Sequence, residues 1–221
     1  MEAEVNGVRL HYELAGNGEK RIVLLHGWGC DGSLMAPVAR ALTGDARVLT
    51  VDFPAHGKSG RPPQPWGVPE FAACLRELLL RLDFLPCGVV AHSFGGRVTI
   101  LLAAEHPEMF TRLVLTGAAG IRPKPTEAAR KRSETYRKLK GLCEGAKKWK
   151  IFGTLPERAE ESLRKKFGSR DYNALDAEMR QTFVKVSSQD LTPYLPRIQQ
   201  PTLLLWGTED TETPLWMGQE M

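Results

Sequence analysis

Short apolar segments alternate with segments of helical periodicity between residues 21 and 116, and this alternation limits the possible folds more than any other feature. The apolar segments have the length and composition of buried strands and occur at residues 21–26, 47–51, 88–91 and 110–116. Segments suited to helices lie between them, at residues 33–42, 70–84 and 97–105. Strands that alternate with helices predict an α/β fold, in which a mostly parallel sheet is flanked by helices.

The remaining parts of the chain indicate how this sheet is extended and interrupted. Residues 3–15 predict two short strands joined at Asn6-Gly7, a dipeptide favoured in hairpin turns. Residues 121–195 are charged and helix-prone, and a further apolar strand follows them. We therefore expect one core built from residues 1–120 and 196–221, interrupted by a basic helical insert at residues 121–195.

The composition indicates a globular protein that can bury a core, with 42% hydrophobic and 25% charged residues in 221 positions. No apolar run approaches the roughly 18 residues that span a membrane, and the N-terminus lacks the basic start and apolar core of a signal peptide. The four cysteines show no metal-binding or redox spacing, so we expect buried or free thiols and no metal site. These features favour a cytoplasmic protein without an integral membrane segment.

The formal charge of +4 conceals a strongly basic region. Residues 121–170 contain 16 Lys and Arg against 6 Asp and Glu, whereas the rest of the chain contains 14 against 20. One interpretation is a solvated helical face, and another is a lid that attracts an anionic acyl substrate. Membrane-surface contact near Trp149 and Phe152 is a weaker alternative. Nucleic-acid binding is not supported, because no reading motif is present.

Ser93 is the candidate for a catalytic nucleophile. It lies in Ala91-His-Ser-Phe-Gly95, between a short apolar strand and a helical segment. A serine on a sharp strand-to-helix turn is presented beyond the end of the sheet, and the crowded backbone there requires small neighbours. The helix that follows directs its first N–H groups towards developing negative charge. A helix-capping serine beside a glycine-rich turn is the alternative interpretation.

A second glycine-rich turn, His26-Gly-Trp-Gly29, ends the first of the apolar strands. Acyl transfer generates a tetrahedral oxyanion, which two backbone N–H donors can stabilise by several kcal/mol. The expected donors are the N–H groups of Trp28 and of Phe94, which directly follows the candidate serine. We expect His26 and Gly27 to support the substrate pocket, with His26 bracing the loop. The structural alternative is a simple tight turn.

Asp210 is the candidate for the acidic residue of the site. It follows the apolar strand at residues 200–206, in Trp206-Gly-Thr-Glu-Asp210. A carboxylate in this place can orient a histidine and stabilise its charged form. Glu209 is the neighbouring alternative, and a turn carboxylate without a catalytic role is the other.

These motifs together resemble the α/β-hydrolase superfamily, in its serine-nucleophile, cap-bearing form. The resemblance rests on four motifs in the family's order: His-Gly-Trp-Gly at 26–29, Asp-Phe-Pro-Ala-His-Gly-Lys-Ser at 52–59, His-Ser-Phe-Gly-Gly at 92–96 and Trp-Gly-Thr-Glu-Asp at 206–210. It implies a nucleophile elbow at Ser93, an oxyanion hole, an acid at Asp210 and no cofactor. It also implies a further strand and helix beyond residue 221, as if the sequence were truncated at its C-terminus.

The family's catalytic residues follow the order nucleophile, acid and histidine. All five histidines of this chain precede Asp210, and none is a convincing substitute: His11, His26, His56, His92 and His106. The resemblance therefore implies a serine hydrolase of an ester, thioester or related carbonyl compound that is incomplete, and nearly inactive, in these 221 residues. The alternatives are a carbon–carbon bond hydrolase or lyase of the same fold and a non-catalytic pseudo-hydrolase that binds a small molecule. The sequence does not indicate an oligomeric state.

Overall fold

The computed structural model describes residues 1–122, 127–147, 155–167 and 170–221, which fall into two compact units. Met1–Arg122 and Gln181–Met221 form the first, which we call the core unit, and Pro123–Arg180 form the second, the insert unit. The sequence pattern puts the return to the core at residue 196, whereas the folded chain returns at residue 181. The assignment of a separate cap domain stays a prediction.

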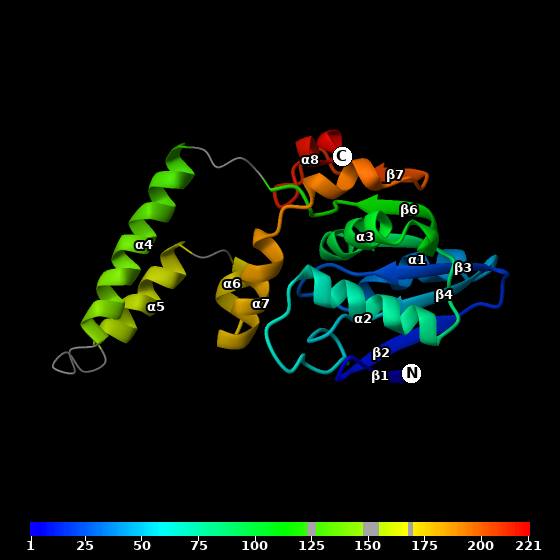
Figure 1. Cartoon of the computed structure of the whole chain (residues 1–221), viewed down its shortest axis with the longest axis horizontal. Coiled ribbons are helices and arrows are strands. Elements are labelled where there is room, and N and C mark those ends of the chain that lie inside the picture. The colour runs from blue at the N-terminus through cyan, green and yellow to red at the C-terminus, as the bar shows by residue number, and fades with distance from the viewer. Residues whose placement is uncertain (123–126, 148–154, 168–169) are drawn as a thin grey trace. The chain divides into compact units, whose positions relative to one another are not determined.

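The core unit is built on a seven-stranded sheet in the order β1-β2-β4-β3-β5-β6-β7 (Figure 1). Its strands are β1 (Glu2–Val5), β2 (Val8–Ala15), β3 (Lys20–Leu25), β4 (Ala46–Val51), β5 (Cys87–His92), β6 (Phe110–Thr116) and β7 (Thr202–Leu205). β1 and β2 form the expected hairpin, in which Asn6 and Gly7 both have positive φ, and β2 pairs antiparallel with β4. The other neighbouring strands are parallel, which confirms the mostly parallel α/β sheet.

Helices cover the sheet on both faces. α2 (Val68–Arg81) and α3 (Phe94–Glu105) lie on one face, and α1 (Ala36–Leu42) lies on the other (Figure 1). The strand order explains this division, because the β3-to-β4 connection crosses the sheet in the opposite direction from the connections through α2 and α3. Right-handed crossovers then place the helices on opposite faces. The short 3-10 helix η4 (Thr192–Arg197) packs against α3.

The helices begin where local hydrogen bonds stabilise their first turns. Asp31 caps the 3-10 helix η1 (Gly32–Met35), and its carboxylate accepts the Ser33 N–H at 2.8 Å. α2 begins two residues before the predicted start, and the Glu70 side chain accepts the Gly67 N–H at 2.8 Å. α3 begins at Phe94 rather than at residue 97, because two glycines continue the helix back to the end of β5.

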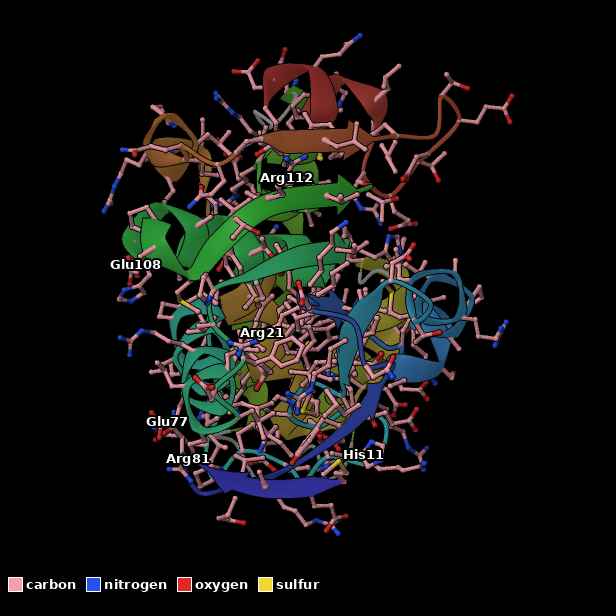
Figure 2. All side chains as sticks on the ribbon, turned by 90° about the vertical axis from the view of Figure 1, so that its right-hand side faces the viewer. His11, Arg21, Glu77, Arg81, Glu108 and Arg112 are labelled. Atoms are coloured by element: carbon pink, nitrogen blue, oxygen red, sulfur yellow. The ribbon has the colours of Figure 1, made fainter. Side chains whose placement is uncertain are left out.

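The two faces of the sheet and its edges differ in burial. The C-terminal halves of β3 and β4 are buried, but on β7 the side chains of Leu203 and Leu205 are 54% and 48% exposed, since β7 is the last strand in the order. On the α1 face, a hollow of about 730 Å³ lies over β3, β5 and β6. Arg21 and Arg112 line it and lie on the same side of the molecule (Figure 2).

The insert unit is helical in its described residues, and we find no strand there. It contains α4 (Glu127–Lys147), α5 (Leu155–Phe167), α6 (Arg170–Ala174) and the start of α7 (Ala177–Ser188). Arg132 joins α4 to α5, because its guanidinium donates to the Lys166 carbonyl at 3.1 Å and lies 5.5 Å from the Phe167 ring. Trp149 and Phe152, proposed as membrane contacts, lie outside the described residues. None of the described helices combines the length and apolarity needed to cross a bilayer.

Candidate active site

Ser93 occupies a sharp turn between β5 and α3. Its φ of 47° and ψ of −107° lie in a region that non-glycine residues rarely adopt. Such a conformation costs about 1–3 kcal/mol and persists only where surrounding contacts hold it. Here the Ser93 N–H donates to the Thr116 carbonyl at 3.2 Å, and the Ser93 carbonyl accepts the N–H groups of Gly96 and Ala119, both at 3.0 Å. The turn is therefore fixed from both sides.

Glycines allow β3 and α3 to approach this turn closely. A Cβ atom on Gly95 would lie 2.7 Å from the Leu25 carbonyl oxygen and 2.8 Å from the Leu25 Cβ. A Cβ atom on Gly27 would lie 3.3 Å from the Ser93 Cβ. The structure thus brings the loop after β3, with Gly27 and Trp28, beside Ser93, as the four-motif pattern predicts.

His26 orients the peptide group that precedes Trp28. Its Nδ1–H donates to the Gly27 carbonyl at 2.7 Å, and its Nε2 accepts the Phe53 N–H at 3.0 Å. Because a trans peptide points its C=O and N–H in opposite directions, the first bond turns the Trp28 N–H away from His26. Neither the Trp28 N–H nor the Phe94 N–H donates a hydrogen bond to any described residue. Both donors therefore have capacity for a ligand oxygen.

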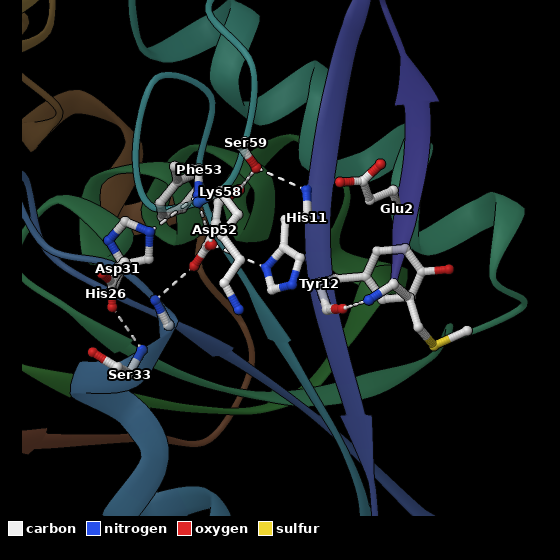
Figure 3. Close-up of polar contacts among 12 residues, drawn as sticks. Glu2, His11, Tyr12, His26, Asp31, Ser33, Asp52, Phe53, Lys58 and Ser59 are labelled. Carbon is white, nitrogen blue, oxygen red and sulfur yellow. Dashed lines mark hydrogen bonds and ion pairs between the residues drawn. The ribbon is translucent and has the colours of Figure 1, made fainter.

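Asp52 ties this loop to two other parts of the chain (Figure 3). Its Oδ1 accepts the Gly32 N–H at 2.7 Å, and its Oδ2 accepts the Lys58 N–H at 2.9 Å. The same Oδ2 lies 3.0 Å from Nδ1 of His11, which belongs to β2. Since Asp52 is buried, these bonds satisfy a carboxylate that would otherwise be costly to remove from water. The loop after β3 is consequently held by buried polar contacts as well as by packing.

Aromatic rings pack against the side chains of Trp28 and Phe94. The Trp28 ring contacts the rings of His56, Phe94 and Phe183 with centroids 4.9, 5.4 and 5.3 Å apart. Phe94, which is buried, also contacts Phe53 at 4.9 Å. Edge-on aromatic pairs of this kind add about 0.5–1.5 kcal/mol each beyond the burial of their surface. These ring contacts hold the side chains of Trp28 and Phe94, the two residues whose N–H groups have no partner among the described residues.

Asp210 follows β7 and lies beside the end of β6. Its Oδ1 accepts the N–H groups of Glu212 and Thr213 at 2.9 and 2.8 Å, and its Oδ2 lies 2.8 Å from the Thr213 hydroxyl. Partial burial raises the pKa of Asp210, but these hydrogen bonds and the nearby His92 outweigh it, so that the pKa falls below its ordinary value. Asp210 is thus a carboxylate at neutral pH. The alternative candidate, Glu209, is exposed.

The five histidines all have partners away from the Ser93 hydroxyl. His92 directly precedes Ser93, but its Nδ1–H donates to the Thr116 carbonyl at 3.0 Å. The others bind elsewhere: His11 to Asp52, His26 to Gly27 and Phe53, His56 to Pro54, and His106 to Glu108. The Ser93 hydroxyl itself forms no hydrogen bond with a described residue. None of the five histidines is therefore hydrogen-bonded to the Ser93 hydroxyl.

The cysteines do not contribute to this arrangement. All four are free thiols, and burial raises the pKa of both Cys74 and Cys87 to about 12. Within the described residues, no group of His, Cys, Asp and Glu side chains is arranged to hold a metal ion.

Sequence reasoning missed Thr213 and Ala119. The Thr213 hydroxyl lies between Asp210 and the Gly117 carbonyl, which it reaches at 3.0 Å, so it connects the turn after β7 to the end of β6. A threonine three residues after an aspartate is a signal for such a turn. Ala119 acts through its backbone N–H alone, and no side-chain pattern indicates it.

Comparison with known proteins places the chain in a family. The model of the Alpha/beta hydrolase family matches residues 22–221, which is most of the sequence. The chain belongs to the alpha/beta hydrolase family. This alpha/beta hydrolase is 33% identical to an uncharacterized protein of Mycobacterium tuberculosis (strain ATCC 25618 / H37Rv). The matched region covers 53% of this chain. The chain spans only about a third of that relative, 34% of its length.

Other relatives match this alpha/beta hydrolase along its whole length. A 2-hydroxy-6-oxononadienedioate/2-hydroxy-6-oxononatrienedioate hydrolase of Pseudomonas sp is 28% identical over 100% of this chain and 81% of the relative. The solved structure of the enol-lactonase from Burkholderia xenovorans LB400 is 25% identical, with a TM-score of 0.72. That match covers 100% of this chain and 86% of the other. The first relative is named as a hydrolase and the second as an enol-lactonase. Both names agree with membership of the alpha/beta hydrolase family.

The buried His56 should make this alpha/beta hydrolase sensitive to acid. Burial lowers the pKa of His56 to about 4 from 6.5, although its bond to the Pro54 carbonyl opposes the shift. The unfolded chain therefore binds a proton at higher pH than the folded chain does, so stability present above pH 6.5 is lost as the pH falls towards 4. This difference corresponds to roughly 3 kcal/mol of unfolding free energy.

Urea unfolding at pH 7, 5.5 and 4 tests this expectation. The parent protein should lose roughly 3 kcal/mol more stability over this range than the variant His56→Gln. His106→Gln is the matched control, because His106 is partly exposed and lies outside the site. Equal pH dependence in the parent and in His56→Gln would contradict the expectation.

Proposed function

We propose that this protein is a cofactor-independent serine hydrolase of a small ester, thioester or related carbonyl compound. The observation that carries the proposal is the backbone of Ser93, held at φ 47° on the turn between β5 and α3. A strained, over-determined residue of this kind is typical of a functional site. The N–H groups of Trp28 and Phe94, which have no partner among the described residues, and the ionised Asp210 support the same interpretation.

In the proposed reaction, Ser93 Oγ attacks the carbonyl carbon of the substrate. The carbonyl oxygen becomes an oxyanion and accepts hydrogen bonds from the Trp28 and Phe94 N–H groups. A histidine oriented by Asp210 would take the serine proton and give it to the leaving group. Because the five histidines of the chain are engaged elsewhere, we expect turnover by these 221 residues to be about three to six orders of magnitude below that of a complete triad.

A carbon–carbon bond hydrolase is the second candidate. It is favoured by the relative from Pseudomonas sp, a 2-hydroxy-6-oxononadienedioate/2-hydroxy-6-oxononatrienedioate hydrolase that matches the whole chain. Its named substrate is a dianion, and the basic residues of the insert would suit an anionic acyl compound. Comparing activity on dicarboxylate and on uncharged esters distinguishes the anionic class from the neutral class. A pseudo-hydrolase that binds without turnover is the alternative if neither class reacts even when imidazole is added.

A fluorophosphonate probe tests the serine hydrolase proposal directly. We expect a covalent adduct on the peptide that contains Ser93, identified by mass spectrometry, with labelling accelerated by added imidazole. The adduct should be absent from Ser93→Ala and retained in Ser33→Ala, which removes an exposed serine of η1. Labelling of Ser93 no faster in the native than in the urea-unfolded protein would contradict the proposal.

A further inference from the structure

The backbone carbonyl of Ser93 is bonded to the chain that leaves β6. Ala119 N–H donates to it at 3.0 Å, in addition to the bond from Gly96 within the first turn of α3. The strained φ of Ser93 depends on such contacts, because the conformation is unfavourable on its own. The position of Ala119 therefore affects the geometry of the candidate nucleophile.

Ala119 belongs to a structure that we call the neck, formed by residues 118–122 and 188–192. These stretches flank the insert, and both lie in the core unit. Leu191 N–H donates to the Gly120 carbonyl at 2.9 Å, so the outgoing and returning chains are hydrogen-bonded to each other. The neck also fits closely against α3, because a Cβ atom on Gly120 would lie 2.9 Å from the Ile100 Cδ1.

Arg97 connects α3 to the returning half of the neck. It lies one turn after Ser93, its side chain is 8% exposed, and its Nη1 donates to the Gln189 carbonyl at 2.7 Å. Burial lowers the pKa of Arg97 to about 10, although nearby Asp190 opposes this shift. A buried guanidinium is costly unless polar groups compensate it. Arg97 is a charged residue on the buried helix α3, so its desolvation must be compensated by polar contacts. Its bond to the Gln189 carbonyl is such a contact, and it connects α3 to the neck.

We propose that Arg97 is a positioning residue, which closes the neck through Gln189 and so keeps the Ala119 N–H bonded to the Ser93 carbonyl. The path has three hydrogen bonds: Arg97 to Gln189, Leu191 to Gly120, and Ala119 to Ser93. The effect of Arg97 on the reactivity of Ser93 rests on the proposed function, whereas the effect of Arg97 on the neck does not. Arg97 does not touch the reacting atoms, and it acts only through the backbone of the turn.

Amide hydrogen exchange of the full chain tests the first part, with peptides that cover 117–122 and 188–192. Arg97→Met should accelerate exchange in both peptides by about tenfold, because a charge-assisted bond to a carbonyl is lost. Arg97→Lys retains a charged donor and should give intermediate exchange. Arg21→Met is the matched control, since Arg21 also donates to one carbonyl, that of Leu85 at 2.9 Å, but at the opposite end of the strands.

The rate of fluorophosphonate labelling at Ser93 tests the second part. We expect Arg97→Met to label about tenfold more slowly than Arg21→Met, with Arg97→Lys restoring part of the rate. If Arg97→Met does not fold, the same comparison is made between Arg97→Lys and Arg21→Lys. Unchanged exchange in the neck peptides overturns the proposal, and so does faster exchange with unchanged labelling. If the parent protein is not labelled, the proposed function fails, whereas exchange at the neck still decides whether Arg97 closes it.

Discussion

Added imidazole should restore ester hydrolysis to this protein, in a manner that depends on Ser93 and Asp210. The site contains a serine, two free N–H donors and an ionised carboxylate, but the histidines of the chain are bonded elsewhere. A free imidazole can accept the serine proton and be oriented by the carboxylate, as a histidine side chain would be. The rate on a short p-nitrophenyl ester should therefore exceed the sum of the rates with protein alone and imidazole alone.

Variants distinguish this rescue from hydrolysis by imidazole in solution. Ser93→Ala should lose the entire protein-dependent part of the rate, and Asp210→Asn should lower that part, because the carboxylate that orients the imidazole is lost. Ser33→Ala, which replaces an exposed serine of η1, should behave like the parent protein. The rate should follow the concentration of neutral imidazole as the pH changes. If the rescued rate is the same in Ser93→Ala as in the parent protein, Ser93 is not the nucleophile and the proposed function is wrong.

Replacing Gly96 with alanine should destabilise the fold strongly, although it adds a single methyl group. A Cβ atom at this position would overlap the Ala118 methyl group, and it would lie 3.0 Å from the Ala118 Cα. Both residues are buried where α3 meets the neck, so the strain cannot be relieved by moving into solvent. We expect a loss of about 2 kcal/mol of unfolding free energy and a fall of roughly 4–8 °C in the thermal midpoint.

A double variant shows whether this specific contact is responsible. Ala118→Gly removes the methyl group that Gly96→Ala would meet, so the pair should recover part of the stability lost by Gly96→Ala alone. Recovery should be partial, because the Ala118 Cα remains close. Gly44→Ala is the matched control, since a Cβ atom there meets nothing within 4 Å, and it should change the stability by less than about 0.5 kcal/mol. Additive effects in the double variant would contradict the assignment of the contact.

The parts of this fold that follow from local sequence were predictable. Asn6-Gly7 adopts the positive φ values of the hairpin, and the apolar runs form the parallel strands in the expected chain order. The turn at Ser93 was predictable for the same reason, because the signal lies within a few residues on either side of it. The residues proposed for the site also come together in space: the loop with Trp28 lies beside Ser93, and Asp210 lies at the end of β6.

The parts that depend on distant contacts were not predictable. In the sequence, Arg97 is one polar residue within an apolar helical segment. Only the folded structure shows that it donates to the carbonyl of Gln189, 92 positions later. The exposure of Leu203 and Leu205 depends on how many neighbours β7 has, which the composition of the strand does not encode. The start of α3 was predicted too late, because Gly95 and Gly96, a residue type that usually ends a helix, are here required by close packing against Leu25 of β3 and against Ala118.

The bond between the Thr213 hydroxyl and the Gly117 carbonyl has a consequence for folding kinetics. It joins residues 96 positions apart, and the bond from Arg97 to Gln189 spans 92 positions. Contacts of such high sequence separation require long loops to close before they contribute, which slows their formation. The hairpin and the central strands can form without them. We therefore expect the geometry around Ser93 to be completed among the last steps of folding, so that serine labelling during refolding should lag behind the recovery of secondary structure measured by circular dichroism.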